Sequence, residues 1–347
     1  MHHNERFQNN YDLLRLFAAC SIIFYHSFSL LHKAGSEPLV QFTKGRINFS
    51  FIGLSIFFCI SGFLIAKSAA RSPGVVNYLW KRLLRIQPLL VITCVLTVFI
   101  CVFFTNLSAK EYFSNPNTWT YFRNIMPVFG LQFTLPGVFI HNLAENGVNG
   151  SLWTLIVEER LYILMCIIFL LRKKHSIYIV LFIAILNLFY LGNRFFFDGE
   201  MVPYFRSLPF FYALLFLNSA ALYFLKIRFS NSLFLFISIS LAVFIIAIVS
   251  PSLNFLYFFS IPFLVNSIAQ IKGVTNHAGK YGDFTYGIYV FSFPVQQMFI
   301  AAGINEQNPY ELFLLTLLIV FPMAILSWNM VEKKFLGLKK SVGVPDK

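Results

Sequence analysis

Residues 49–67 read FSFIGLSIFFCISGFLIAK, an apolar run in which the first charged side chain is Lys67. A helix needs about 17 to 25 such residues to cross the hydrocarbon core of a bilayer. Nine further segments of comparable length and apolarity are present, near residues 12–31, 86–105, 152–171, 176–192, 207–225, 232–250, 253–271, 284–303 and 310–331. The sequence therefore predicts an all-α integral membrane protein with about ten transmembrane helices.

The composition agrees with this class of protein. Of the 347 residues, 58% are hydrophobic and 12% are charged, and 44 are phenylalanine. A soluble globular domain carries about 25% charged residues, so this chain lacks the polar side chains to cover a water-facing surface. A large soluble domain, a disordered chain and a secreted disulfide-stabilised domain are excluded. The five cysteines lie in apolar runs without metal-ligand spacing, and we expect neither a metal site nor a tightly bound cofactor.

The basic residues indicate the orientation in the membrane. With the N-terminus in the cytoplasm, 18 of the 27 Lys and Arg residues fall in inner segments and 7 in outer loops. This asymmetry is the positive-inside pattern, and an even number of spans places both termini in the cytoplasm. We expect one transmembrane domain over residues 1–347, with a cytoplasmic N-terminus at 1–11 and a basic cytoplasmic tail at 332–347. The net charge of +13 then requires no nucleic-acid partner.

The longest predicted connection runs from residue 106 to residue 150. It contains Pro116, Pro127 and Pro136 together with several aromatic residues. Because aromatic side chains favour the membrane interface, we expect this connection to fold back onto the membrane surface.

Three ionisable residues, Asp12, Arg15 and His26, lie in the first predicted helix. Charged groups within a span are costly and usually functional. The spacing of Arg15 and His26 returns them to within about 20° of the same helix face, about 16 Å apart along the axis. Asp12 precedes Arg15 by one helical turn, so it can pair with Arg15 and fix its direction. One polar stripe on a lipid-spanning helix indicates a lined cavity, with Arg15 near the inner membrane face and His26 in the outer half.

Two further clusters place charges at or within the membrane. Arg82 and Arg85 project from one helix face at the inner end of the third span, a spacing suited to phosphate oxygens. Glu158 and Glu159 lie in the fourth span at a depth of about 10 Å, and His26 lies about 8 Å from the outer end of its own helix. Adjacent helical residues point about 100° apart, so only one of these carboxylates can easily face His26. The sequence does not decide which.

Each cluster also has a plainer interpretation. His26 can be a packing histidine bonded to a neighbouring helix, and Asp12 and Arg15 can form an interfacial ion pair. Arg82 and Arg85 can serve only the positive-inside orientation. Two carboxylates within one span are harder to explain by packing.

Short motifs occur along the chain in a fixed order. They are Tyr11–Ala19 running to His26, Phe57–Leu64, Arg82 with Arg85, Ser151–Tyr162, and Thr285–Tyr289 followed by Pro294. Over nearly the whole chain they resemble, in order, the motifs of the membrane acyltransferase 3 family. Those motifs are Arg-x10-His, Phe-Phe-x-x-Ser-Gly, Arg-x-x-Arg, Trp-Ser-Leu-x-x-Glu and Ser-Tyr-x-x-Tyr.

The chain departs from the family's pattern at two places. Ser292 stands where many relatives have a histidine, so the role of that histidine is not carried over. The closing motif, Trp328 to Glu332, lacks the proline that usually follows. Many relatives also carry a soluble esterase-like domain after the last span, and this sequence ends at Lys347 without one. We expect the membrane domain to complete the transfer itself or to pass the acyl group to a separate protein.

The resemblance implies an O-acyltransferase of the bacterial cytoplasmic membrane. Such an enzyme moves an acyl group, commonly acetyl, from acetyl-CoA or another acyl-CoA to a hydroxyl of lipopolysaccharide, capsule or another lipid-linked or surface glycan. His26 is then the general base, and a carboxylate such as Glu158 orients the imidazole and stabilises its cation. Arg82, Arg85 and Arg15 bind the donor's phosphates. The distance from Arg15 to His26 is of the order of the pantetheine arm's length, so no acyl-enzyme is required.

Two rival functions are compatible with a polytopic membrane protein. A secondary transporter or glycan flippase also places ionisable groups midway in the bilayer. The sequence contains no internal repeat and places its basic cluster at the inner rim, which disfavours this class. A purely structural scaffold does not explain the ionisable residues within the spans. The sequence names neither the acceptor sugar nor the acyl group nor the oligomeric state.

Overall fold

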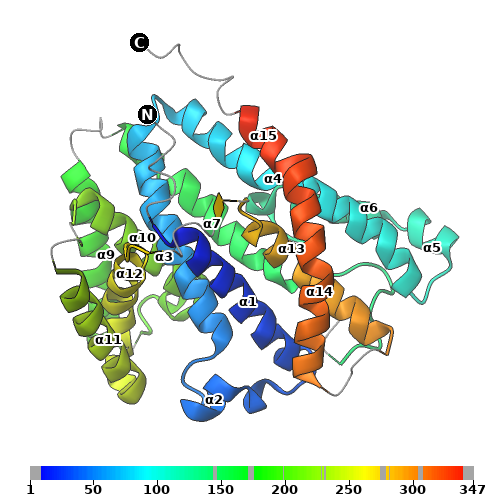
Figure 1. Ribbon diagram of the computed structural model, residues 1–347, viewed down its shortest axis with the longest axis horizontal. Coiled ribbons are helices and arrows are strands. Elements are labelled where there is room, and N and C mark those ends of the chain that lie inside the picture. Colours follow the sequence, from blue (N-terminus) through cyan, green and yellow to red (C-terminus); the bar gives the residue numbers. More distant parts are fainter. Residues whose placement is uncertain are drawn as a thin grey trace. The chain divides into compact units, whose positions relative to one another are not determined.

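The computed structural model describes residues 9–143, 147–170, 176–197, 199–227, 229, 232–273, 279–280, 282–303 and 308–338. Over these ranges the regular structure consists of α-helices and short 3₁₀ turns, with a π-helical turn at Trp328–Glu332 and an isolated antiparallel bridge between Thr105 and Val138 (Figure 1). The all-α class predicted from the sequence is confirmed for these residues.

Each of the ten predicted membrane segments contains a helix. The helices are α1 (Tyr11–Ser29), α3 (Phe49–Arg71), α4 (Val75–Ile100), α7 (Trp153–Leu164), α9 (Ser176–Phe196), α10 (Leu208–Phe224), α11 (Leu233–Val249), α12 (Tyr257–Ile268), α13 (Thr285–Ala301) and α14 (Pro309–Ser327). Shorter helices are α2 (Pro38–Phe42), α5 (Ala109–Ser114), α6 (Pro116–Thr120), α8 (Ile167–Leu170) and α15 (Lys333–Gly337).

Five helical stretches of the described residues are long and apolar enough to cross a membrane. They are Phe49–Arg71, Val75–Phe104, Ile177–Phe196, Pro251–Ile268 and Pro309–Gly337. Two shorter apolar helices are Leu208–Phe224 and Leu233–Val249. The number of ten spans and the cytoplasmic placement of the termini stay predictions, and residues 1–8 and 339–347 lie outside the described part of the chain.

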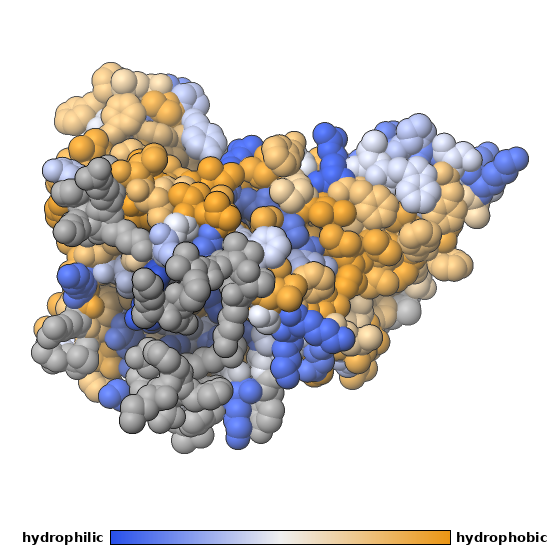
Figure 2. Space-filling model, turned by 90° about the horizontal axis from the view of Figure 1, so that it is seen from above, coloured by the Kyte–Doolittle hydropathy of each residue, from blue (hydrophilic) through white to orange (hydrophobic). Residues whose placement is uncertain are grey.

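Large apolar side chains are exposed on several of these helices. Phe234 on α11 is 78% exposed, Leu188 on α9 is 68% exposed and Leu318 on α14 is 67% exposed. In the view of Figure 2, apolar residues occupy large parts of the visible surface, with hydrophilic residues between them. Helices that are apolar on their outward faces as well as their inward faces are typical of membrane spans.

The helix α4 begins earlier than the hydrophobic pattern predicts. The predicted span starts near residue 86, whereas the helix starts at Val75 and includes Arg82 and Arg85. A hydropathy pattern reports only the lipid-facing part of a helix, because basic side chains such as arginine have good helix propensity and extend the helix beyond the apolar run. The basic pair therefore lies on a continuous helix with the span.

Contacts divide the chain into two compact units. The first comprises Met1–Ala18, Ile52–Tyr78 and Leu161–Tyr281, and the second comprises Ala19–Phe51, Leu79–Arg160 and Gly282–Lys347. We describe each unit by itself. One transmembrane domain over the whole chain stays a prediction.

In the first unit, α10 packs against α9 and α12, and α11 packs against α12 (Figure 1). A chain of hydrogen bonds crosses this unit. Tyr11 donates its hydroxyl to Oδ1 of Asn266 (3.1 Å), Nδ2 of Asn266 donates to Oγ of Ser219 (2.7 Å), and that hydroxyl donates to the carbonyl of Cys59 (2.6 Å). Polar contacts of this kind hold membrane helices together, because lipid offers the side chains no alternative partner.

A glycine of the Phe57–Leu64 motif provides the closest approach between two helices of this unit. A Cβ atom on Gly62 of α3 would lie 2.1 Å from the backbone oxygen of Phe216 on α10. Small residues allow membrane helices to approach backbone to backbone. The motif therefore has a packing role at Gly62.

In the second unit, α13 and α14 lie side by side (Figure 1). The two tyrosines of the Thr285–Tyr289 motif fasten α13 to other helices of the unit. Tyr286 donates its hydroxyl to the carbonyl of Ile86 on α4 (3.2 Å), and Tyr289 donates to the carbonyl of Ser151 just before α7 (2.7 Å). The Tyr-x-x-Tyr spacing thus joins α13 to α4 and to the start of α7.

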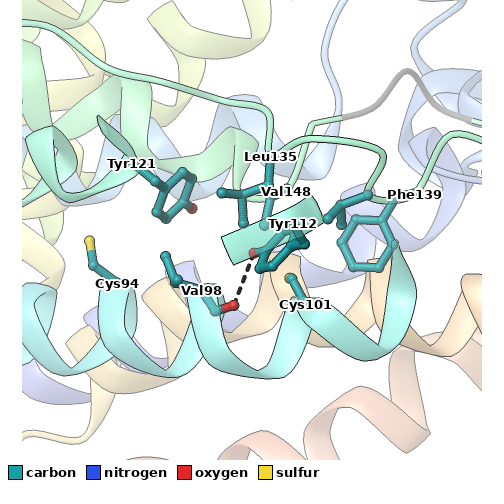
Figure 3. Packing of buried hydrophobic residues seen from close by; sticks show 9 residues of the cluster. Cys94, Val98, Cys101, Tyr112, Tyr121, Leu135, Phe139 and Val148 are labelled. Atoms are coloured by element: carbon teal, nitrogen blue, oxygen red, sulfur yellow. Dashed lines mark hydrogen bonds between the residues drawn. The ribbon is translucent and has the colours of Figure 1, made fainter. Parts of the chain in front are cut away.

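The connection after α4 folds back onto the end of that helix. The hydrophobic core between the connection and α4 consists of Cys94, Val98, Cys101, Tyr112, Tyr121, Leu135, Val138, Phe139 and Val148 (Figure 3). Tyr112 donates its hydroxyl to the carbonyl of Val98 at 2.9 Å, the bond drawn in Figure 3. Burial raises the pKa of Tyr121 well above its usual value, so this phenol stays neutral. The connection is a compact cap on α4.

Candidate active site

The imidazole of His26 lies in the last turn of α1, in the second unit. Its ring is half-buried and meets the ring of Phe293 on α13 edge to face, with the ring centres 5.2 Å apart. Atom Nδ1 is buried and has no hydrogen-bond partner among the described residues. A buried polar atom of this kind requires an explanation, and a bound substrate group or water is one.

A buried glutamine fixes the turn of α1 that carries His26. Nε2 of Gln296 on α13 donates to Oγ of Ser27 at 2.7 Å and to the carbonyl of Ile23 at 3.1 Å. Gln296 and Ser27 are both fully buried. The residue in the family's histidine position, Ser292, donates its hydroxyl to the carbonyl of Tyr289 at 3.0 Å and is likewise buried.

Phe293 also contacts the segment that leads into α7. A Cβ atom on Gly150 would stand 2.8 Å from Cζ of Phe293. The aromatic ring therefore lies against both His26 and Gly150, and a larger residue at position 150 would displace it.

Arg15 and Asp12 form the ion pair expected from their spacing. Nη1 of Arg15 lies 3.5 Å from Oδ1 of Asp12, and the two side chains are 22% and 33% exposed. A Cβ atom on Gly279 would clash with the Asp12 carboxylate at 1.9 Å, so this glycine leaves room for it. These contacts lie within the first unit. Because α1 is one continuous helix, Arg15 and His26 keep their separation of about 16 Å along it.

Arg85 is bound by two carboxylates within the second unit. Its Nη2 lies 2.5 Å from Oδ2 of Asp283, and its Nη1 lies 3.4 Å from Oε2 of Glu332. The rings of Tyr286 and Trp328 lie 5.8 and 6.0 Å from the guanidinium carbon, within the range of cation–π attraction. The π-helical turn Trp328–Glu332 presents both the Trp328 ring and the Glu332 carboxylate to Arg85. Arg82, one turn earlier on α4, is half-buried.

The two glutamates of α7 have different surroundings. Glu159 is 8% exposed and accepts hydrogen bonds from Nε2 of Gln87 (2.8 Å) and from the backbone N–H of Val128 (2.7 Å). Glu158, the preceding residue of α7, is half-buried.

The described residues include no hydrogen bond between His26 and either glutamate of α7. The structure places the His26 ring against Phe293, and Gln296 bonds the neighbouring residue Ser27. Among the described residues no group of His, Cys, Asp and Glu side chains is arranged to hold a metal ion.

Several residues of these clusters could not be identified from the sequence. Glu332 belongs to the closing motif, and Asp283 precedes the Thr285–Tyr289 motif by two positions, but nothing in the sequence pairs either with Arg85. Gln296 is detectable only as a polar residue within an apolar helix. Of the other histidines, His32 bonds the carbonyl of Leu143, and His175 and His277 lie outside the described residues.

Comparison with known proteins gives a family match and two curated relatives. The family model of an acyltransferase domain matches residues 8–330. An "O-acetyl transferase" of Shigella phage Sf6 is 31% identical over 94% of this chain and 96% of its own length. "Nodulation protein 10" of Rhizobium leguminosarum bv. viciae is 26% identical over 98% of this chain and 96% of its own length. No solved structure matches the chain.

Proposed function

This chain belongs to the acyltransferase 3 family and is a membrane acyltransferase, and from that premise we propose that it is a glycan O-acetyltransferase. In this proposal it moves an acetyl group from acetyl-CoA, presented on the cytoplasmic side, to a hydroxyl of a lipid-linked or cell-surface glycan. The similarity to a phage O-acetyl transferase over nearly the full length of both chains supports the acyl group and the reaction type.

The observation that carries the proposed chemistry is the imidazole of His26, half-buried on α1 with Nδ1 unpartnered among the described residues. Histidine is the side chain whose ordinary pKa range suits proton transfer near neutral pH. The imidazole takes the proton of the acceptor hydroxyl while the hydroxyl oxygen attacks the thioester carbonyl carbon. The carbon–sulfur bond then breaks, the imidazolium returns the proton to the departing thiolate, and the products are an ester and free coenzyme A.

In this proposal, charged residues support the imidazolium of His26 and bind the phosphates of the donor. Glu158 is assigned the support of the imidazolium once substrate is bound, because catalytic hydrogen bonds often form only in the complex. Arg82 and Arg85 on α4 are assigned the phosphates of coenzyme A, and Arg15 on α1 is assigned to the same group. The separation of about 16 Å along α1 is of the order of the pantetheine arm's length, so direct transfer is possible.

Donor-dependent labelling tests this function directly. Purified protein in lipid vesicles is mixed with radiolabelled acetyl-CoA and with glycan extracted from source cells that lack the gene. We expect base-labile label in the glycan and stoichiometric release of coenzyme A thiol. Movement of glycan across the vesicle membrane without any ester formation would favour a transporter and contradict the proposal.

A further inference from the structure

We propose that Gln296 is a positioning residue for His26, an inference that rests on the proposed role of His26 as the general base. Gln296 does not touch the reacting groups in this assignment. It holds the turn of α1 on which the imidazole is mounted, and Phe293 on the same helix limits where the ring can lie.

The first argument is the geometry of the amide. Nε2 of Gln296 donates to Oγ of Ser27 (2.7 Å) and to the carbonyl of Ile23 (3.1 Å). The hydroxyl of Ser27 in turn donates to the same carbonyl at 3.0 Å. A backbone carbonyl only accepts, so the NH₂ end of the amide must face α1. Ile23 and Ser27 are one helical turn apart and enclose His26 in the sequence, so one amide clamps that turn.

The second argument is that Gln296 is a poor choice for packing alone. Its side chain is 0% exposed, and its Oε1 is buried without a hydrogen-bond partner among the described residues. An apolar side chain of the same length would fill the space without burying an unsatisfied acceptor. What the apolar side chain would lose is the pair of hydrogen bonds to Ser27 and Ile23.

The third argument is the ring contact made by the same helix. Phe293 precedes Gln296 by one turn of α13 and meets the imidazole edge to face at 5.2 Å. The ring also lies close to Gly150, where even a Cβ atom would lie 2.8 Å from Cζ. The ring therefore has no room to withdraw toward Gly150. Gln296 and Phe293 together determine the position of the imidazole from α13.

Position matters because a general base acts only within about 2.6–3.2 Å of the proton that it removes. A displacement of about 1 Å can reduce the rate about 100-fold. Loss of the hydrogen bonds from Gln296 to α1 should slow the chemical step without changing the binding of the distant donor phosphates. We therefore expect an effect on kcat with little effect on the KM for acetyl-CoA.

Gln296→Met tests this assignment, because methionine has a similar length and no donor. We expect kcat to fall about 10- to 100-fold while the KM for acetyl-CoA changes by less than about twofold. Gln297→Met is the matched control. Gln297 is the next residue, is equally buried, and donates to the carbonyl of Gly147 instead of to α1 (2.8 Å), so we expect its kcat within about threefold of the parent.

A second variant and a double-mutant cycle distinguish a failure of this inference from a failure of the role proposed for His26. Ser27→Ala removes the side-chain hydrogen-bond acceptor on α1 and should also lower kcat. This variant tests the same contact if Gln296→Met inserts poorly into the membrane. Adding Gln296→Met to His26→Ala should cause no further loss, because both changes act through one group. Equal kcat for Gln296→Met and Gln297→Met, or a further loss in the double variant, overturns this inference. Normal transfer by His26→Ala overturns the general-base role on which this inference rests, whereas the absence of any acetyl transfer by the parent protein overturns the proposed function itself.

Discussion

Arg85 is held by Asp283 and Glu332, carboxylates that lie 198 and 247 positions away along the sequence. Glu332 is 2% exposed, so its charge is nearly cut off from water. Removing one member of a buried ion pair is strongly destabilising, because the other charge stays buried without its partner. In the proposed enzyme, donor phosphates therefore compete with these carboxylates for one guanidinium.

Alanine substitutions at Arg82 and Arg85 test the donor site. Each change should weaken acetyl-CoA binding by about 1.5–3 kcal/mol, the cost of a lost charged hydrogen bond. Arg85→Ala should also lower the melting temperature, because it leaves Asp283 and Glu332 facing each other. Calorimetric titration with acetyl-CoA and a thermal melt measure both effects, with Lys110→Ala on α5 as a basic control. Unchanged affinity in a correctly inserted double variant would mean that the pair serves orientation only.

The two glutamates of α7 should respond differently to the same isosteric change. Glu159→Gln replaces the carboxylate by a neutral amide, so the hydrogen bonds from Gln87 and the Val128 N–H lose their charged acceptor and the Gln87 amide must turn over to accept from the new NH₂ group. We expect a stability loss of about 1–3 kcal/mol with transfer per folded molecule retained. Glu158→Gln should lower kcat and leave the melting temperature near that of the parent. Identical behaviour of the two variants would contradict the division of roles.

The existence of the helices is the structural feature of this protein that its sequence predicts best. Ten apolar segments predict ten helices, because each span must satisfy its backbone within itself. The start of α4 at Val75 is not predictable from an uninterrupted apolar run, since the helical residues 75–85 include the basic residues Lys81, Arg82 and Arg85. The pairing of Gly62 with Phe216 and the bonds of Gln296 to α1 depend on which helices become neighbours. Such contacts join positions far apart in the chain, and no local pattern contains them.

Packing between α3 and α10 can be tested at Gly62. Gly62→Ala places a methyl group against the backbone oxygen of Phe216, so the two helices must separate. We expect a lower melting temperature and lower yield of inserted protein. Gly192→Ala on α9 is the control, because nothing lies within 4 Å of the place that its methyl group would take and alanine has the better helix propensity. Equal melting temperatures for the two variants would show that the close approach carries no stability.

At the scale of the whole molecule, the family match over residues 8–330 and the apolar helices agree on a membrane acyltransferase. The uneven distribution of Lys and Arg residues also predicts the orientation in the membrane, which neither of these observations gives. With 18 of 27 basic residues on one side, the segment from Lys67 to Arg85 and both termini should face the cytoplasm.

Cysteine accessibility measures this topology. Single cysteines at Pro73, which is exposed between α3 and α4, and at Ser341 in the C-terminal tail should resist a membrane-impermeant maleimide in intact cells. A cysteine at Lys110 in the cap after α4 should react. Labelling of the Ser341 position from outside would contradict the predicted orientation.

The central claim is that His26 performs the chemical step for the whole transfer reaction. A general base contributes about 10²- to 10⁴-fold in rate, so His26→Ala should nearly abolish transfer while insertion and acetyl-CoA binding persist. Loss of a merely packing histidine would instead lower yield or melting temperature and leave activity per folded molecule intact. His32→Ala and His141→Ala are the matched controls in the loops.

The most direct measurement is therefore acetyl transfer per correctly folded molecule for His26→Ala, with acetyl-CoA affinity determined on the same sample. We predict a loss of at least about 100-fold in transfer with donor affinity unchanged. Normal donor affinity together with transfer within a few-fold of the parent protein would contradict the mechanism.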